Sequence, residues 1–368
     1  MTIRIGTFNA ENLFRRPKAF ALEDDAKRDK ILSDFNELAS LLEKDTYEPA
    51  DKQRIAEIIK DHQVHNGEKD SPRPFFINEL KGSGAKLFTA SGPVANPTIT
   101  IVADGRGDWP GWAEFVRGDL SWTAVQNTAR VVAEVNADVL LMVEAEDRLT
   151  LERFNDNVLG ETLGHQPYAF NLLIDGNDPR GIDVGILSRH PITSVRSHVF
   201  DPGQGGRRLF SRDCPEFETA INGTPLWILG NHFKSKRGGG EGLRVRQAER
   251  VREIYQAALQ RSDHVIVAGD LNDFLDSPPV RTLLDAGLEE AMTHPSYTGD
   301  PGTHGPGTGD DDKLDYLMFS PTLWDRVEHV EVERRGIWAP RTFKSFPTVT
   351  SKATQASDHA ALYADLDL

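Results

Sequence analysis

The stretch VIVAGDLND, residues 265–273, decides the fold class of this chain. Its apolar run has the length of a strand and ends at Gly269, and the polar residues Asp270 and Asn272 follow at once. A short apolar run bounded by turn-forming residues is typical of a buried strand. Because α/β proteins place their chemistry at the ends of such strands, Asp270 and Asn272 are candidate site residues.

Other apolar runs of the chain end in the same way. One polar residue at the end of a strand commonly marks only the exit of the chain from the core. Five or six ends that all bear a carboxylate, an amide or an imidazole predict one clustered site. The residues concerned are Asn9 and Glu11 after IRIGTF (3–8), Glu144 after VLLMV (139–143), His232 after LWILG (226–230), Asp315 within KLDYLMF (313–319), and Asp358 and His359 before the last strand.

The residue types in this set indicate its chemistry. Carboxylate and amide oxygens suit Mg²⁺ or Mn²⁺. The sequence has no cysteine cluster and no HExxH motif, which argues against a structural or protease-type zinc site. A hard cation, a carboxylate that activates water and imidazoles that face an oxyanion together predict hydrolysis of a phosphate ester.

The charge of the chain restricts what it can bind. Its 368 residues carry a formal net charge of -15, which argues against broad binding to duplex nucleic acid through a cationic face. Residues 207–252, however, hold ten Lys or Arg against five Asp or Glu, so a local patch can meet an anionic substrate. The one cysteine, Cys214, excludes an internal disulfide and lacks a flanking catalytic pattern.

The absence of a recognisable targeting signal predicts a cytoplasmic protein. The first residues form a strand-like run rather than a basic region followed by an apolar stretch, so no signal peptide is recognised. No apolar run approaches the roughly 20 residues of a membrane span. Nothing in the sequence indicates an obligate protein partner.

The order of the elements predicts a mixed-sheet α/β protein. Helical patterns cover residues 121–137, with Ser121 as the N-cap, and residues 243–261 and 278–287. Strand patterns include 138–147, 184–189, 264–273, 312–320 and 359–368, and Asn222-Gly223 is the turn of a hairpin over 216–233. Residues 20–90 are polar and helix-prone, and a strand over 98–103 follows, which indicates an insertion.

Seven segments together resemble the endonuclease/exonuclease/phosphatase superfamily, which includes DNase I-like nucleases, inositol-phosphate phosphatases and bacterial sphingomyelinases. They are TFNAENLF (7–14), LLMVEAED (140–147), GIDVGILSRHPI (181–192), GNHFKSK (230–236), VAGDLND (267–273), LDYLMFS (314–320) and SDHAAL (357–362). The resemblance covers residues 1–14 and about 120–368. It implies a single domain over 1–368, built as a four-layer α-β-β-α sandwich of two mixed sheets, with a largely helical insertion or cap over 20–115.

The resemblance also implies roles for individual residues and a Mg²⁺ cofactor, with Mn²⁺ or Ca²⁺ as substitutes. Asn9 and Glu144 lie at the metal, with Asp358 on its other side. Asp270 orients or deprotonates water, Asn272 holds a phosphoryl oxygen or the base, and His359 faces the phosphate while Asp315 holds its ring. His232 is a second catalytic histidine that Asp183 could orient, Lys234 contacts phosphate, and Glu11 is either a supporting or a purely structural residue.

Three functions are compatible with these residues. The leading one is a phosphodiesterase that acts on nucleic acid, because NHFKSK is typical of bacterial nucleases of this family. The alternatives are hydrolysis of a small molecule or lipid head group, which the net charge favours, and a non-catalytic binding module, which the complete polar set disfavours. A loop that contains His294 and His304 is a further candidate to lie near the site.

Overall fold

The computed structural model describes residues 2–13, 15–22, 24–68, 71–79, 84–178, 180–236 and 240–368. The chain divides into two compact units. The first comprises Met1–Arg15 and Leu120–Leu368, and the second comprises Arg16–Asp119. The residues of the predicted site all belong to the first unit.

The first unit contains two six-stranded mixed sheets. In the first sheet the strand order is β17-β18-β1-β8-β10-β9, and β1 lies parallel to β8 and antiparallel to β18. Its strands are β1 (Thr2–Leu13), β8 (Val139–Ala145), β9 (Phe170–Leu173), β10 (Asp183–Ser188), β17 (Val327–Glu333) and β18 (Ala361–Asp367).

The second sheet has the strand order β11-β12-β13-β14-β16-β15. Its centre is the parallel pair β13 and β14, and the other neighbouring strands are antiparallel. The strands are β11 (Ile192–Arg196), β12 (Glu216–Ile221), β13 (Thr224–His232), β14 (Val265–Asp270), β15 (Glu289–Glu290) and β16 (Asp315–Phe319).

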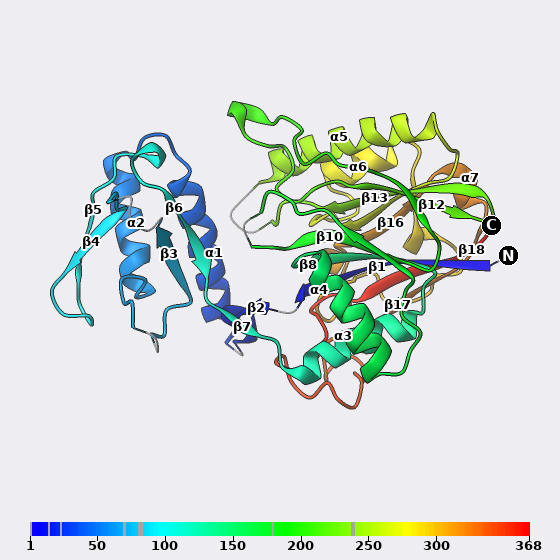
Figure 1. The fold of residues 1–368 in the computed structure, drawn as a ribbon, viewed down its shortest axis with the longest axis horizontal. Coiled ribbons are helices and arrows are strands. Elements are labelled where there is room, and N and C mark those ends of the chain that lie inside the picture. Colours follow the sequence, from blue (N-terminus) through cyan, green and yellow to red (C-terminus); the bar gives the residue numbers. More distant parts are fainter. Residues whose placement is uncertain are drawn as a thin grey trace. The chain divides into compact units, whose positions relative to one another are not determined.

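Helices cover the outer faces of both sheets (Figure 1). The helix α3 packs against the first sheet, and α5 and α6 pack against the second sheet. The helices of this unit are α3 (Trp122–Val135), α4 (Arg148–Arg153) with a π-helical continuation (Phe154–Thr162), α5 (Glu241–Leu259), α6 (Pro278–Leu284) and α7 (Pro321–Trp324).

The central strands are buried on both faces, which explains their continuous apolar sequences. In β8, Val139, Leu141 and Val143 belong to the core between the two sheets. The alternate residues Leu140 and Met142 belong to the core shared with α3. The first unit is therefore a four-layer α-β-β-α sandwich, and this confirms the predicted fold class.

Two local predictions are also confirmed. The Ser121 hydroxyl accepts a hydrogen bond from the Ala124 N–H at 3.1 Å and caps α3. The hairpin of β12 and β13 turns at Asn222 and Gly223, whose φ angles are 51° and 82°. Positive φ at both central residues is the conformation that makes Asn-Gly a favoured hairpin turn.

The second unit is less helical than the sequence predicts. Its strands β2 (Arg15–Pro17) and β7 (Arg117–Asp119) pair where the chain enters and leaves this unit. Between them lie α1 (Asp25–Leu42), α2 (Pro49–Asp61) and the paired strands β3 (Phe75–Glu79) with β6 (Gly111–Phe115) and β4 (Phe88–Ser91) with β5 (Thr98–Ile101). Its core includes Phe35, which stacks on Phe115 with ring centroids 3.8 Å apart.

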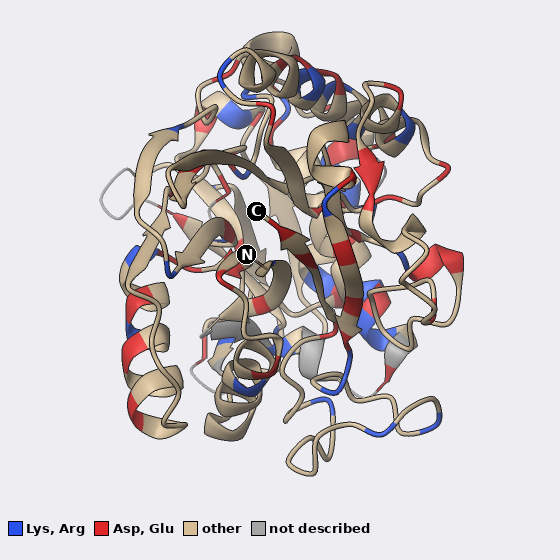
Figure 2. Ribbon diagram, turned by 90° about the vertical axis from the view of Figure 1, so that its right-hand side faces the viewer, with Lys and Arg blue, Asp and Glu red and all other residues tan. Residues whose placement is uncertain are grey.

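In the view of Figure 2, acidic and basic residues are interspersed along the described ribbon. Within the described part of the chain, no helix combines the length and the apolar character that a membrane crossing requires.

Candidate active site

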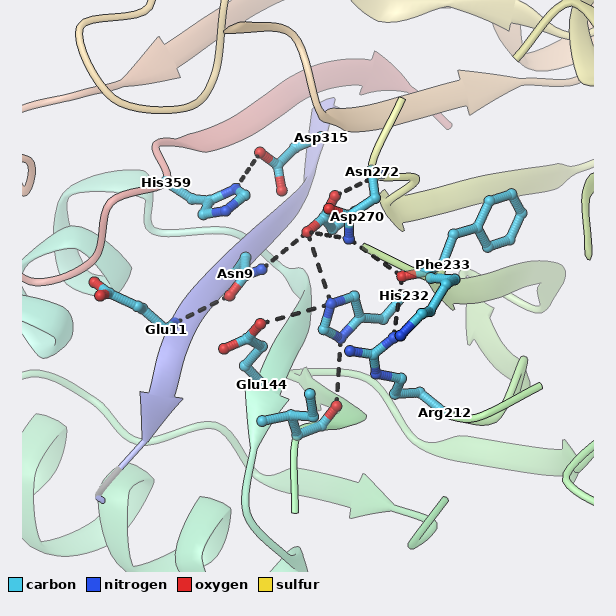
Figure 3. Close-up of polar contacts among 12 residues, drawn as sticks. Asn9, Glu11, Glu144, Arg212, His232, Phe233, Asp270, Asn272, Asp315 and His359 are labelled. Atoms are coloured by element: carbon cyan, nitrogen blue, oxygen red, sulfur yellow. Dashed lines mark hydrogen bonds and ion pairs between the residues drawn. The ribbon is translucent and has the colours of Figure 1, made fainter. Parts of the chain in front are cut away.

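Most of the predicted site residues converge in the second half of β1, where β8, β13 and β14 end and where β16 begins. In the second sheet, His232 pairs with Asp270, and Asp270 pairs with Asp315. In the first sheet, Asn9 pairs with Val143, the residue before Glu144. The two packed sheets therefore bring these strand ends together from both sides (Figure 3).

Asp270 lies at the centre of the site. The Asn9 side-chain amide donates to Asp270 Oδ2 at 3.1 Å, so the two sheets are joined at this point. The Asn272 backbone N–H donates to Asp270 Oδ1 at 2.8 Å, and the Asn272 side-chain amide donates to Oδ2 at 3.2 Å. Burial and the nearby charge of Asp315 raise the pKa of Asp270 to about 7. A carboxylate with this pKa is suited to accept a proton from water near neutral pH.

His359 is held by Asp315. The ring Nδ1–H of His359 donates to Asp315 Oδ2 at 2.8 Å, and the Thr303 hydroxyl donates to the same oxygen at 2.7 Å. Burial by itself lowers the pKa of His359, but the attraction and hydrogen bond of Asp315 outweigh it and raise that pKa well above its usual value. The ring is therefore an imidazolium whose Nε2–H is directed away from Asp315.

His232 has the opposite electrostatic character. Its Nδ1–H donates to the Ile182 carbonyl at 3.3 Å. Its Nε2 lies 3.6 Å from Glu144 Oε1 and 3.8 Å from Asp270 Oδ2. Burial and the positive charges of Arg212 and Arg180 lower the pKa of His232 well below its usual value. This ring is neutral, and it presents Nε2 to the centre of the site.

The described hydrogen bonds do not connect Asp183 with His232, the ring that it was expected to orient. The Asp183 carboxylate accepts a hydrogen bond from the Gly176 N–H at 3.0 Å and therefore faces the loop before β10. The group that orients His232 is the carbonyl of the preceding residue, Ile182. A contact from the backbone carries no side-chain signal, so the sequence pattern could not reveal it.

Glu144 is positioned by a residue that the sequence analysis missed. The Asn12 side-chain amide donates to Glu144 Oε2 at 2.8 Å. Burial raises the pKa of Glu144 and so disfavours its charged form, although His359, Arg212 and Arg180 oppose this effect. A buried carboxylate in this condition is stabilised by an additional cation.

Glu11 braces the segment that carries Asp358 and His359. Its Oε2 accepts hydrogen bonds from the Asp358 N–H at 2.9 Å and from the Gln355 side-chain amide at 3.2 Å. The Ser357 hydroxyl donates to the Asn9 carbonyl at 2.7 Å, which fixes the same segment to β1. Glu11 therefore supports the geometry of the site.

The backbone of the site is strained. Seven described residues other than glycine have positive φ, and four of them lie at this site: Glu11, Asn12, Glu144 and Asn272, at 48°, 61°, 67° and 51°. Non-glycine residues hold this conformation only when the surrounding structure imposes it, and such positions cluster at functional sites. The strain in Glu11 and Glu144 is the more informative, because glutamate is rarer than asparagine at positive φ.

The predicted metal ligands Asn9, Glu144 and Asp358 bear amide and carboxylate oxygens of the kind that Mg²⁺ prefers. Among the described residues, two groups of three side chains bring potential ligand atoms within 4.8 Å of one another, and both include His359. They are Asp270 with Asp315 and His359, and His304 with Asp358 and His359.

Several residues near the site have no strand-end signal in the sequence. His304 lies 3.5 Å from Asp358 Oδ2, and its ring is 4.9 Å from that of His359. Arg212 donates to the Phe233 carbonyl at 3.2 Å, and that carbonyl also accepts from the Asn272 amide at 3.2 Å. These residues come from loops, and only the folded chain brings them together.

Comparison with known proteins identifies the family of the chain. A family model described as "Endonuclease/Exonuclease/phosphatase family" matches residues 123–359. Sphingomyelinase C of Listeria ivanovii is 22% identical over 271 residues, which are 68% of this chain and 76% of that protein. Phospholipase C of Staphylococcus aureus is 23% identical over 242 residues, which are 60% of this chain and 68% of that protein.

A solved structure resembles part of the chain. The crystal structure of truncated Caenorhabditis elegans TDP2 gives a TM-score of 0.47 at 19% identity, and the match covers 67% of this chain and 90% of that chain.

Proposed function

Because the chain belongs to the endonuclease/exonuclease/phosphatase family, we propose that it is a Mg²⁺-dependent phosphodiesterase that hydrolyses nucleic acid. The observation that carries the proposal is the arrangement around Asp270. A carboxyl group with a pKa of about 7 lies beside a neutral histidine, His232, and the site also holds a protonated one, His359. Groups whose environments drive their pKa values apart are suited to different roles in one reaction.

The metal would be held by Asn9, Glu144 and Asp358. When bound, the ion neutralises charge on the phosphoryl oxygens and lowers the pKa of water. Asn12 and Glu11 keep the ligands in place, the first through Glu144 and the second through the backbone of Asp358.

The attack on phosphorus would depend on Asp270. The Asn9 and Asn272 hydrogen bonds fix both of its oxygens. Asp270 would therefore hold the attacking water in one orientation and take up its proton. Asn272 lies two residues beyond the end of β14 and would hold this base in place.

The two histidines would act on different oxygens. The imidazolium of His359, held by Asp315, would stabilise the negative charge that develops on the phosphoryl oxygens. His232 is fixed through its Nδ1 by the Ile182 carbonyl. Its Nε2 carries no proton and is therefore available to accept one from water.

A lipid head group is the second candidate substrate. The observation in its favour is the similarity to proteins named sphingomyelinase C and phospholipase C. Both candidates are phosphate diesters, so the same residues would carry out the chemistry. Nucleic acid is preferred because basic residues are concentrated in residues 207–252.

A panel assay tests the proposal. The purified chain is incubated with Mg²⁺ or Mn²⁺ and with plasmid DNA, single-stranded DNA, RNA or sphingomyelin vesicles, and Asp270→Asn serves as the control. We expect cleavage of at least one nucleic acid by the unmodified chain and strongly reduced cleavage by the variant. Hydrolysis of sphingomyelin alone would replace the proposal by the second candidate, and full cleavage by the variant would show that Asp270 does not have the proposed role.

A further inference from the structure

Three basic side chains from three loops gather beside the proposed catalytic centre. They are Arg180 before β10, Arg212 before β12 and Lys234 after β13, and we call them the cationic cluster. Arg212 shares the Phe233 carbonyl with Asn272, and Figure 3 shows its guanidinium next to His232. The cluster therefore adjoins the position that the phosphate would occupy.

One carboxylate, that of Asp178, pairs with two of these three positive charges. Asp178 accepts two hydrogen bonds from the Arg180 guanidinium, at 2.9 and 2.7 Å, and its Oδ2 lies 3.3 Å from Arg212 Nε. A single negative charge is thus shared by two guanidinium groups. Arg212 is only 2% exposed, so water compensates little of the remaining charge.

Lys234 adds a third positive charge to the cluster. Its backbone N–H donates to Gln247 and its carbonyl accepts from Arg244. No hydrogen bond or ion pair joins its ammonium group to a residue that the structure describes. Burial, together with repulsion from Arg180 and Arg212, lowers the pKa of Lys234 to about 8. Lys234 directly follows Phe233, whose carbonyl accepts the hydrogen bond of Arg212.

We propose that the cationic cluster binds a second anionic group of the substrate, next to the phosphate that is hydrolysed. Consecutive phosphates of a nucleic acid strand supply such a pair. The inference rests on the proposed function. It predicts that the substrates share a second anionic group next to the phosphate that is hydrolysed.

The alternative head-group chemistry is disfavoured by the same residues. A lipid head group that ends in a quaternary ammonium would place a fourth cation beside Arg180, Arg212 and Lys234. Like charges placed together in this way oppose binding. A phosphate would instead be attracted by the positive charge of the cluster, and the ammonium group of Lys234 would donate charge-assisted hydrogen bonds to it.

Two matched substrates test the inference. Thymidine 5′-(p-nitrophenyl phosphate) has one phosphate, and its 3′-phosphorylated derivative has two. We expect kcat/KM to be at least about tenfold higher for the derivative, because hydrogen bonds to charged groups contribute at this scale. The variants Arg180→Gln and Lys234→Met should bring the ratio of the two kcat/KM values close to one.

The control variant is Arg326→Gln. Arg326 lies between α7 and β17 and donates to the Asp367 carbonyl at 3.4 Å, at the end of the first sheet away from the site. The variant Arg326→Gln removes one positive charge, as Arg180→Gln does, and should preserve the ratio of the two kcat/KM values. Lys234→Met removes no described contact of the ammonium group, so it serves as the test if Arg180→Gln does not fold.

A binding measurement separates this inference from the proposed function. Isothermal titration with thymidine 3′,5′-bisphosphate and thymidine 5′-monophosphate should show tighter binding of the bisphosphate, and Lys234→Met should remove the difference. If that result is obtained but neither thymidine p-nitrophenyl ester is hydrolysed, binding of a second anionic group by the cationic cluster is supported and the proposed function is wrong. Equal affinities and equal kcat/KM values in the unmodified chain would overturn the cluster and leave the proposed function intact.

Discussion

Replacement of Asp315 by asparagine tests how His359 acts. Asp315 is completely buried, and its Oδ2 accepts hydrogen bonds from His359 and Thr303. Asparagine keeps the size and one carbonyl oxygen but removes the negative charge. Loss of a hydrogen bond to a charged group removes about 1.5–3 kcal/mol, which corresponds to about a 10- to 150-fold decrease in kcat.

The pH dependence gives this prediction a second readout. The carboxylate of Asp315 is what raises the pKa of His359 against the effect of burial. Without it, burial lowers that pKa, and the imidazole loses its proton at a lower pH. We therefore expect the activity of Asp315→Asn to fall at a lower pH than that of the unmodified chain as the pH rises, and to be relatively better preserved in acid.

The assay is kcat on an aryl phosphodiester between pH 5 and 9, on protein whose fold is verified by circular dichroism. Thr303→Val is the matched control, because it removes a hydrogen bond to the same oxygen but leaves the charge. It should reduce kcat by less than about tenfold and leave the pH profile in place. Unchanged kcat and an unchanged profile in Asp315→Asn would refute the reasoning.

Three further outcomes are expected. Asp270→Asn and His359→Ala should each reduce kcat by at least about a hundredfold without loss of the fold, and near-normal turnover in either would mean that the roles are assigned to the wrong residues. Gly269→Ala should lower the melting temperature and abolish activity together, because φ is 122° there and an added Cβ would lie 2.0 Å from the Asn231 carbonyl oxygen; a stable, active variant would contradict this. Burial raises the pKa of Asp183 to about 7, so the stabilising effect of its neutral form is complete below pH 4 and is lost as the pH rises through 7. The free energy of unfolding of Asp183→Asn should therefore rise by up to about 4 kcal/mol relative to that of the unmodified chain between pH 4 and pH 8. A difference between the denaturation midpoints of the two proteins that is the same at both pH values would count against this prediction.

The sequence predicts the parts of this protein that are determined locally. The hairpin turn at Asn222 and Gly223 follows from backbone conformation, and the cap at Ser121 follows from one side-chain hydrogen bond. The buried strands β8 and β14 follow from their apolar runs. Strand β17 is different, because three of its seven residues are exposed and its three glutamates interrupt the apolar pattern.

The sequence could indicate the strand-end residues of the site but not its supporting contacts. Asn9 and Asp270 are recognisable because each follows an apolar run. Their hydrogen bond, however, joins two different sheets, and the two residues are distant in sequence. The Ile182 carbonyl that orients His232 belongs to the backbone. Arg180 and Arg212 lie in separate loops, so no spacing in the sequence relates them.

The most direct test of the central claim is the metal dependence of Glu144→Gln. We expect the metal-stripped chain to lose turnover of an aryl phosphodiester in EDTA and to regain it with Mg²⁺ or Mn²⁺. In Glu144→Gln the Mg²⁺ concentration for half-maximal activity should rise by about tenfold or more, on the scale known for altered metal sites. The control Glu146→Gln, two residues further along the chain, should behave like the unmodified protein. Full turnover of the metal-stripped chain in EDTA, or identical Mg²⁺ curves for the two variants, would contradict the account.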